Sequence, residues 1–253
     1  MGHQQTYLHN EAYAEFLAGW DESFYAKYAD TLRPDQAGER VLDVGCGVGQ
    51  VVRRLRDDGY AAQGVEVSEP SVAKAREFGL DCQVYDGQRL PFPDRHFASV
   101  GALNVLEHVE EPEAFLVELA RVVQPGGQVV VSSPNFFRVL GWHDYHPAMR
   151  GVRNKWRNAC RLLAKFRQMR AAPDRVRFDR MTPIVKEPFT PDDDAIVATN
   201  SLEIAFFLGR AGCQVQRVQC TDRYVRQPID FLLNFTPLRY GMFNAFVVAR
   251  RQP

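Results

Sequence analysis

The chain has 253 residues, of which 45% are hydrophobic and 25% charged, and its formal net charge is zero. These values are ordinary for one globular domain with a sizeable core, and the length is short for two. No apolar run reaches the ~18 residues that a membrane span needs. Residues 1–5 do not begin a secretory signal, and five cysteines without a C-x-x-C pair indicate reduced thiols, so we expect a cytoplasmic protein.

The first predicted element is one helix over residues 10–32, because large apolar side chains recur there at three- and four-residue steps. They are Tyr13, Phe16, Leu17, Trp20, Phe24 and Tyr28. Such a stripe packs against the rest of the fold or covers a ligand site, and the two roles are compatible.

A short apolar strand then ends near Asp43, and three glycines alternate at Gly45, Gly47 and Gly49 before the next helix. Glycine permits positive φ and a close approach of the backbone to a ligand. The N-terminus of the following helix presents free backbone N–H groups to the same space. The acidic Asp43 favours a cationic ligand over a phosphate. Cys46 is interpreted as a small residue that fits the turn.

Strands and helices continue to alternate up to residue 135. Further strands are expected over residues 61–67, 81–85, 97–103 and 128–132, with a helix over 112–123. This alternation predicts a mostly parallel sheet with helices on both faces. Ligands bind such sheets beyond the carboxyl ends of the strands, where Asp43, Glu66 and Leu103 are expected to meet.

The order and spacing of these motifs over residues 40–135 resemble the class I S-adenosylmethionine (SAM) dependent methyltransferases. The stretch from Leu42 to Gly49 is similar to that family's motif hh-D-h-G-x-G-x-G, and the match is closest to the quinone and natural-product branch. The resemblance implies an α/β fold, with a Rossmann-like doubly wound sheet of seven strands in the order 3-2-1-4-5-7-6 and the last strand antiparallel. It also implies that residues 10–32 cap the site.

The same resemblance implies SAM as the cofactor and S-adenosylhomocysteine as its product. The glycine loop would hold the methionine half, with Asp43 near the ammonium group, and Glu66 would accept from the ribose hydroxyls. Asp86 would accept from the adenine amine, unless it only forms its own turn, and Asn104 would face the methyl donor. The full predicted cofactor set is Asp43, Gly45, Cys46, Gly47, Gly49, Glu66, Val67, Asp86, Gly87, Gln88, Leu103 and Asn104.

Three histidines are candidate catalytic residues. His108 ends a segment that, in some similar methyltransferases, reads E-x-x-E-H and binds a divalent metal. Asn104 replaces the first of those carboxylates here, which disfavours a metal site. His108 is then a general base, since its ordinary pKa suits neutral pH, or a helix-capping residue. His143 and His146 form an acid/base pair, a pair of metal ligands or ordinary loop residues.

Residues 136–198 depart from the family's minimal core and are predicted to form an inserted lid. The segment from residue 149 to 181 holds 11 Lys or Arg and 2 Asp, a net charge of +9. Its helix, over residues 151–170, carries four apolar residues towards one side: Val152, Trp156, Leu163 and Phe166. The basic lid fits an anionic membrane surface, an anionic, lipid-linked or carrier-bound substrate, or a solvated face, and RNA least well.

Residues 199–253 complete the single methyltransferase domain predicted over residues 1–253. A helix is expected over 200–209 and strands over 214–221 and 243–250. We therefore expect methyl transfer from SAM to a small-molecule acceptor, with O-methylation favoured. A non-catalytic SAM-binding regulator or assembly factor stays open, as does an NAD(P)-dependent oxidoreductase, although the acid before the glycine loop argues against the latter.

Overall fold

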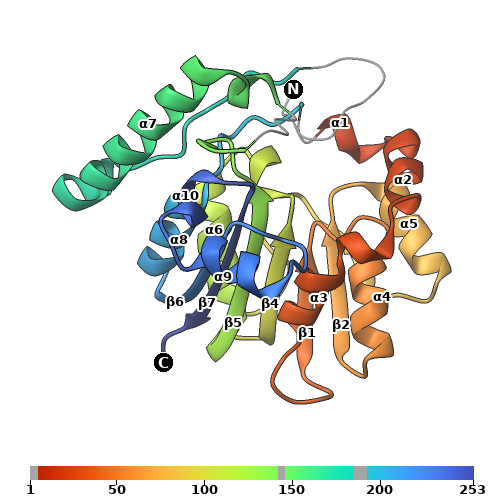
Figure 1. The fold of residues 1–253 in the computed structure, drawn as a ribbon. Coiled ribbons are helices and arrows are strands. Elements are labelled where there is room, and N and C mark those ends of the chain that lie inside the picture. The colour runs from red at the N-terminus through yellow and green to blue at the C-terminus, as the bar shows by residue number, and fades with distance from the viewer. Residues whose placement is uncertain (1–4, 142–145, 185–192) are drawn as a thin grey trace.

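Seven strands pair into one sheet in the computed structural model, which describes residues 5–141, 146–184 and 193–253. They are β1 (Arg40–Val44), β2 (Ala61–Glu66), β3 (Cys82–Val84), β4 (Phe97–Leu103), β5 (Val123–Pro134), β6 (Cys213–Gln219) and β7 (Asn244–Arg251). Their order is β3-β2-β1-β4-β5-β7-β6 (Figure 1). β7 is antiparallel to β5 and β6, and the pairs among β1 to β5 are parallel. The predicted fold class, strand order and orientation of the last strand are confirmed.

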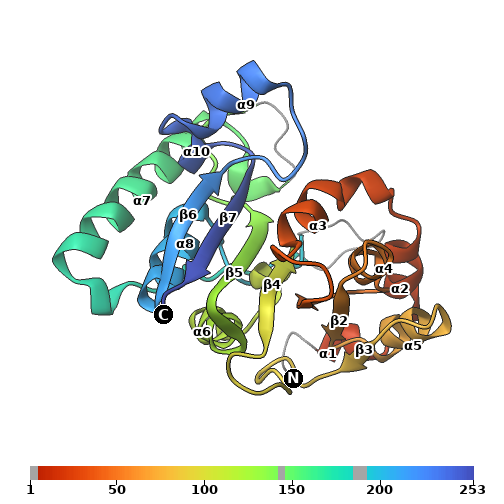
Figure 2. The same cartoon turned by 90° about the horizontal axis from the view of Figure 1, so that it is seen from below.

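Helices cover both faces of the sheet (Figure 2). The α-helices are α1 (Gln5–Leu8), α2 (Glu11–Ala18), α3 (Ala26–Leu32), α4 (Gln50–Asp57), α5 (Glu69–Glu77), α6 (Pro112–Val122), α7 (Val152–Ala171), α8 (Ser201–Arg210), α9 (Gln227–Asn234) and α10 (Leu238–Gly241). Short 3₁₀ turns are η1 (Glu22–Phe24), η2 (Leu106–His108), η3 (Pro147–Met149) and η4 (Pro173–Arg175).

The two faces of β5 show why this strand is apolar along its length. Val129 and Val131 are buried in the core that contains side chains of α6 and α8, and Val130 is buried in the core formed with α3 and α4. Successive side chains of a strand point to opposite faces. A strand covered on both sides therefore needs apolar residues at consecutive positions.

Residues 10–32 are not the single helix that the sequence predicts. α2 ends at Ala18 with Gly19 as its C-cap, and the side chain of Asp21 accepts a hydrogen bond from the Ser23 amide to start η1. α3 follows as a separate helix whose Tyr28 and Leu32 are fully buried. The stripe is thus divided between the core and, as described below, the wall of a cavity.

Most of the other predicted helices and strands lie close to their expected positions, but β5 begins five residues earlier than the expected 128, and α9 and α10 were not predicted. α7 spans Val152–Ala171, where a helix over 151–170 was expected, and α8 begins one residue after the expected start. Within the described ranges, no helix combines the length and the apolar content that crossing a bilayer requires. α1 and α2 lie on one side of the molecule and α7 on the other (Figure 1).

Candidate cofactor and acceptor site

A cavity of about 790 Å³, its mouth included, lies at the carboxyl ends of β1, β2 and β4. It brings together eight residues predicted from the sequence: Asp43, Gly45, Cys46, Gly47, Glu66, Leu103, Asn104 and His108. The N-terminal helices add an apolar and aromatic wall: Tyr7, Tyr13, Phe16, Leu17, Trp20, Phe24 and Tyr25. A neighbouring cavity of about 530 Å³ shares Glu66 and His108 and adds the predicted Val67.

Asp43 is held between two glycines of the adjacent strands. It pairs with Gly64 on β2 and with Gly101 on β4. A Cβ atom at Gly101 would lie 2.4 Å from the Tyr28 hydroxyl, so only glycine leaves room for this ring. Tyr28 donates a hydrogen bond of 2.8 Å to Asp43 Oδ1. The register of the sheet and one residue of α3 therefore fix the orientation of this carboxyl group.

Burial raises the pKa of Asp43 to about 7, because the charged form loses its hydration. The hydrogen bond from Tyr28 lowers this pKa, and the nearby charge of Glu66 raises it. A cationic group in the cavity would favour the charged form of Asp43.

Glu66 is tied to the glycine loop by its own carboxylate. Its Oε2 accepts from the Gly47 amide at 3.1 Å, and its Oε1 accepts from the amides of Val67 at 2.7 Å and Ser68 at 3.2 Å. Burial raises the pKa of Glu66, and these three hydrogen bonds oppose the rise. Oε1 already accepts two hydrogen bonds, so the acceptor capacity that remains for a ligand hydroxyl group is on Oε2.

Two glycines of the loop are required for packing as much as for ligand approach. Gly45 has a φ of 74° and Gly49 a φ of 85°. A Cβ atom at Gly45 would lie 2.2 Å from a methyl group of Val105, and one at Gly49 would lie 2.5 Å from Leu80. Gly49 does not line either cavity, and its predicted role in binding SAM stays a prediction.

The thiol of Cys46 is buried beside that of Cys82. A hydrogen bond with Cys82 and burial hold the pKa of the Cys46 thiol well above its ordinary value. A nucleophilic cysteine needs a depressed pKa. The sequence-based interpretation of Cys46 as a small turn residue agrees with this environment.

Asn104 occupies a strained position at the end of β4. Its φ is 52°, in the left-handed region that non-glycine residues rarely adopt, while its amide donates to Ser132 O at 2.9 Å. Among the described residues, its buried Oδ1 has no hydrogen-bond partner. Such strain costs about 1–3 kcal/mol and is concentrated at functional sites. Asn104 is therefore a strong candidate for ligand contact, as the sequence predicted.

His108 belongs to a cluster that the sequence did not reveal. Tyr7 donates a hydrogen bond to Asp194 Oδ2, and the same hydroxyl lies 3.3 Å from His108 Nδ1. His108 Nδ1 is 3.8 Å from Asp194 Oδ2, and its Nε2 is 3.9 Å from Glu107 Oε1. Burial raises the pKa of Asp194 to about 6. No local motif links Tyr7 or Asp194 to His108, because they lie far apart in the chain.

Besides Gly49, three further predicted cofactor residues lie outside both cavity walls: Asp86, Gly87 and Gln88. Asp86 is exposed, and its Oδ1 accepts from the amides of Gln88 at 2.8 Å and Arg89 at 3.0 Å. This geometry is that of a turn-forming aspartate, the alternative that the sequence left open. Contact between Asp86 and adenine stays a prediction.

Of the second histidine pair, His146 lies within the described residues. His143 lies outside the described residues. His146 caps η3, where its Nδ1 accepts from the Ala148 amide at 3.1 Å, and its ring packs edge-on against Phe136. His146 lines neither cavity. In the described parts of the chain, no three His, Cys, Asp or Glu side chains are grouped so as to hold a metal ion.

Residues 42–131, which include the glycine loop, both buried carboxylates and Asn104, match the family model of a methyltransferase domain. These residues are similar to a methyltransferase domain. The predicted family resemblance is confirmed for this part of the chain. Outside it, the cavity wall is completed by residues of the N-terminal segment, and Asp194 contacts Tyr7 and His108 of that wall.

Two curated relatives align with the methyltransferase domain. The 2-methyl-6-phytyl-1,4-hydroquinone methyltransferase of Synechocystis is 38% identical over 116 residues, which cover 42% of this chain and 34% of the relative. The ubiquinone biosynthesis O-methyltransferase of Aromatoleum aromaticum is 34% identical over 118 residues, which cover 42% of this chain and 50% of the relative. The chain thus spans about half or less of the length of these relatives.

A solved structure extends the similarity beyond the methyltransferase domain to nearly the whole chain. The SAM-dependent methyltransferase from Mesorhizobium loti is 18% identical, with a TM-score of 0.59, and the alignment covers 93% of this chain and 100% of that one. At this identity the likeness shows a shared fold.

Proposed function

We propose that this protein is a SAM-dependent methyltransferase that acts on a small-molecule acceptor, with oxygen as the favoured acceptor atom. The observation that carries the proposal is the pair Asp43 and Glu66, two buried carboxylates in a cavity at the strand ends of this fold. A bound cation offsets the unfavourable burial of negative charge. A pyrophosphate would add negative charge to the same space, which argues against a dinucleotide-dependent oxidoreductase.

The residues of the cavity fit SAM. Asp43 is placed to receive its ammonium group, Glu66 has acceptor capacity left for ribose hydroxyls, and the unpartnered Oδ1 of Asn104 is an acceptor at the same strand ends. When bound, SAM supplies an electrophilic methyl group for in-line transfer. The protein's part is to hold the acceptor in line and to exclude water, which the aromatic wall from the N-terminal helices favours.

On the acceptor side, His108 is proposed as the general base that takes the proton of an acceptor hydroxyl. Asp194 and Tyr7 are proposed as positioning residues, because the Tyr7 hydroxyl lies 3.3 Å and Asp194 Oδ2 3.8 Å from Nδ1 of this ring. A positioned base typically contributes about 10²–10⁴-fold to the rate.

The aromatic wall favours an apolar acceptor of modest size. The relatives named above carry hydroquinone or ubiquinone in their names, and a ring hydroxyl of that kind matches a histidine base. An acceptor that is anionic, lipid-linked or carrier-bound is compatible with the basic residues around α7.

Titration calorimetry with SAM, S-adenosylhomocysteine and NADH tests the cofactor assignment. We expect binding of the first two and none of NADH, and the reverse result would overturn the proposal. Incubation with methyl-labelled SAM and a small-molecule extract then tests turnover. Tight binding of SAM without any labelled product would favour the alternative of a non-catalytic SAM-binding regulator.

A further inference from the structure

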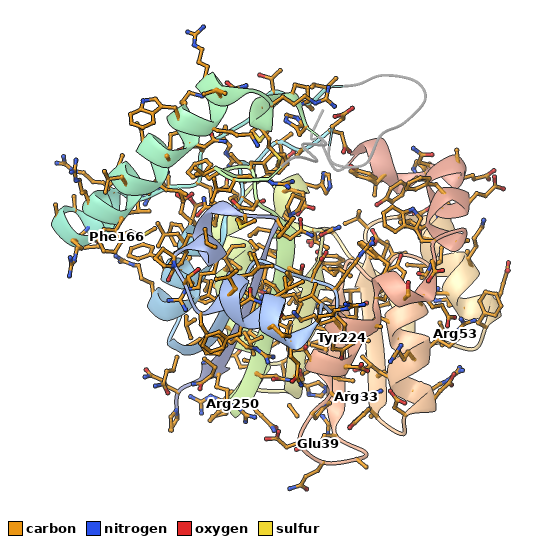
Figure 3. The ribbon with its side chains drawn as sticks, viewed as in Figure 1. Arg33, Glu39, Arg53, Phe166, Tyr224 and Arg250 are labelled. Atoms are coloured by element: carbon orange, nitrogen blue, oxygen red, sulfur yellow. The ribbon has the colours of Figure 1, made fainter. Side chains whose placement is uncertain are left out.

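α7 presents apolar side chains to solvent instead of burying them. The exposed fractions are 85% for Val152, 74% for Trp156, 50% for Leu163 and 47% for Phe166. Val152, Trp156 and Leu163 are spaced by four and seven residues, so they form one stripe along the helix. Phe166 lies on the part of α7 far from the N-terminal helices (Figure 3). A surface helix normally turns such a stripe towards the core.

Polar contacts on the opposite face hold α7 in this orientation. Asn158 is fully buried and donates to the carbonyl oxygens of Phe136 and Arg138, both at 3.1 Å. Lys165 forms ion pairs with Asp179 at 2.7 Å and Glu203 at 2.8 Å. A rotation that buried the apolar stripe would break these contacts and leave buried charges without partners, which costs several kcal/mol. The exposure of the stripe is therefore built into the packing of the helix.

The charged residues of α7 are all positive. The helix contains seven Lys or Arg residues and neither Asp nor Glu. Four of the basic residues are in no ion pair with any residue in the described ranges: Arg153, Arg157, Arg167 and Arg170. By helical spacing Arg167 and Arg170 lie on the solvent-facing apolar stripe and Arg153 borders it. Arg157, the residue after Trp156, is also exposed. Apolar and cationic side chains therefore share one outer surface.

We propose that α7 docks the protein on an anionic membrane surface, with the apolar stripe at the boundary between headgroups and acyl chains. Arginines beside the stripe would then meet lipid phosphates, each contributing favourably near an anionic leaflet. A second copy of the chain is a poor occupant, since pairing two α7 helices would bring like charges together. Of these two partners, only the anionic lipid surface offers acyl chains to the apolar stripe and negative charge to the arginines.

The packing of α7 links this surface to the acceptor side of the cavity. Asn158 anchors the helix on the segment that directly follows β5, and Phe136 of that segment is buried in one cluster with Ala195. Ala195 follows Asp194, the proposed positioning residue of His108. Docking through α7 would therefore hold the acceptor side near the lipid. This consequence rests on the proposed function, whereas the docking itself does not.

Vesicle flotation of the full chain tests the proposal. We expect the protein to float with vesicles of phosphatidylglycerol and phosphatidylcholine, to stay behind with phosphatidylcholine alone, and to be released by high salt. The double variant Trp156→Ser/Arg157→Glu should reduce binding by about tenfold or more. Lys74→Glu/Phe78→Ser on α5 is the matched control, since Phe78 is also highly exposed, and it should bind like the unaltered chain.

A probe on the helix gives a second measurement. Cys160 on α7 is exposed, whereas the other four cysteines are buried, so a thiol-reactive, environment-sensitive dye should label this position selectively. We expect its emission to shift to the blue on addition of the anionic vesicles. Unchanged emission together with no flotation would overturn the proposal, as would α7-dependent dimerisation or RNA binding without lipid binding. The variant Asp43→Asn should still float, which separates failure of docking from failure of SAM binding.

Discussion

Asp43 and Glu66 lie at the ends of neighbouring strands, so the pairing of β1 with β2 sets their separation. The acceptor side is built differently, because Tyr7, His108 and Asp194 come from segments far apart in the chain and meet only through tertiary packing. The proposed cofactor side is thus fixed by the sheet, and the proposed acceptor side by the paths of an N-terminal helix and of the segment that contains Asp194. Changes on the two sides should therefore affect binding and turnover separately.

The largest expected effect is on the acceptor side. His108→Ala should lower kcat by about 10²–10⁴-fold, because a positioned base contributes that much, while SAM affinity stays within a few-fold. Steady-state kinetics together with calorimetry would check both parts. His146→Ala is the matched control and should retain turnover, since His146 caps η3 away from the cavity. Full activity of His108→Ala would contradict the role of His108 as the base, and with it the proposed division into a cofactor side and an acceptor side.

On the cofactor side, Asp43→Asn should weaken SAM binding by about 10–100-fold, the value of a hydrogen bond to a charged group. The melting temperature of the free protein should stay the same or rise at pH 8. Burial of the Asp43 charge is unfavourable, and an amide oxygen can still accept from Tyr28. Calorimetry and thermal unfolding measure the two effects. A large loss of stability with unchanged SAM affinity would show that Asp43 is only structural.

Asp194→Asn should lower kcat by roughly tenfold. The imidazole of His108 would still be present, but it would be held less well in line with the acceptor. SAM affinity should not change. The pH profile of kcat should also shift, since the neutral amide no longer stabilises the charged imidazole. An unchanged pH profile with reduced stability would indicate that Asp194 supports only the fold.

The smallest effect is the dependence of SAM affinity on pH. With a pKa of about 7, Asp43 is charged above neutrality, so affinity should fall by at most about tenfold per unit as the pH drops below 7. The pKa of Asp43 in the folded protein lies above its ordinary value of 3.8. The contribution of Asp43 to the free energy of unfolding is therefore fully present below about pH 3.8 and is lost as the pH rises towards 7. Calorimetry in buffers of different ionisation enthalpy should detect proton release on SAM binding near pH 7. No release would contradict a role for Asp43 beside a cation.

Local patterns predict the cofactor side well. The glycine loop and the positions of both carboxylates follow from spacings within residues 40–135, and the sheet order follows from the family resemblance that these motifs carry. The break after α2 was also readable, since Gly19 and Asp21 are common helix stop and start residues, but the longer apolar period concealed it. Tyr7 and Asp194 carry no such signal, because their role depends on where distant segments cross.

The orientation of α7 shows a second limit. Its period identifies an amphipathic helix, yet the residues that attach it to the body are Asn158 and Lys165, whose partners lie on other segments. From the apolar stripe alone, one would expect the stripe itself to face the core, which is the reverse of the observed orientation. For Asp86, the spacing in the sequence matches the family, while the side chain accepts a hydrogen bond within its own turn.

Gly101 has no side chain and does not line the cavity, yet it admits the ring that orients Asp43. Any larger residue there would displace Tyr28 and change the acidity of a group on the adjacent strand. A mutational survey confined to positions that face the ligand would overlook it. In this fold, the charge of Asp43 also depends on Gly101, whose contribution is the space that a side chain would otherwise fill.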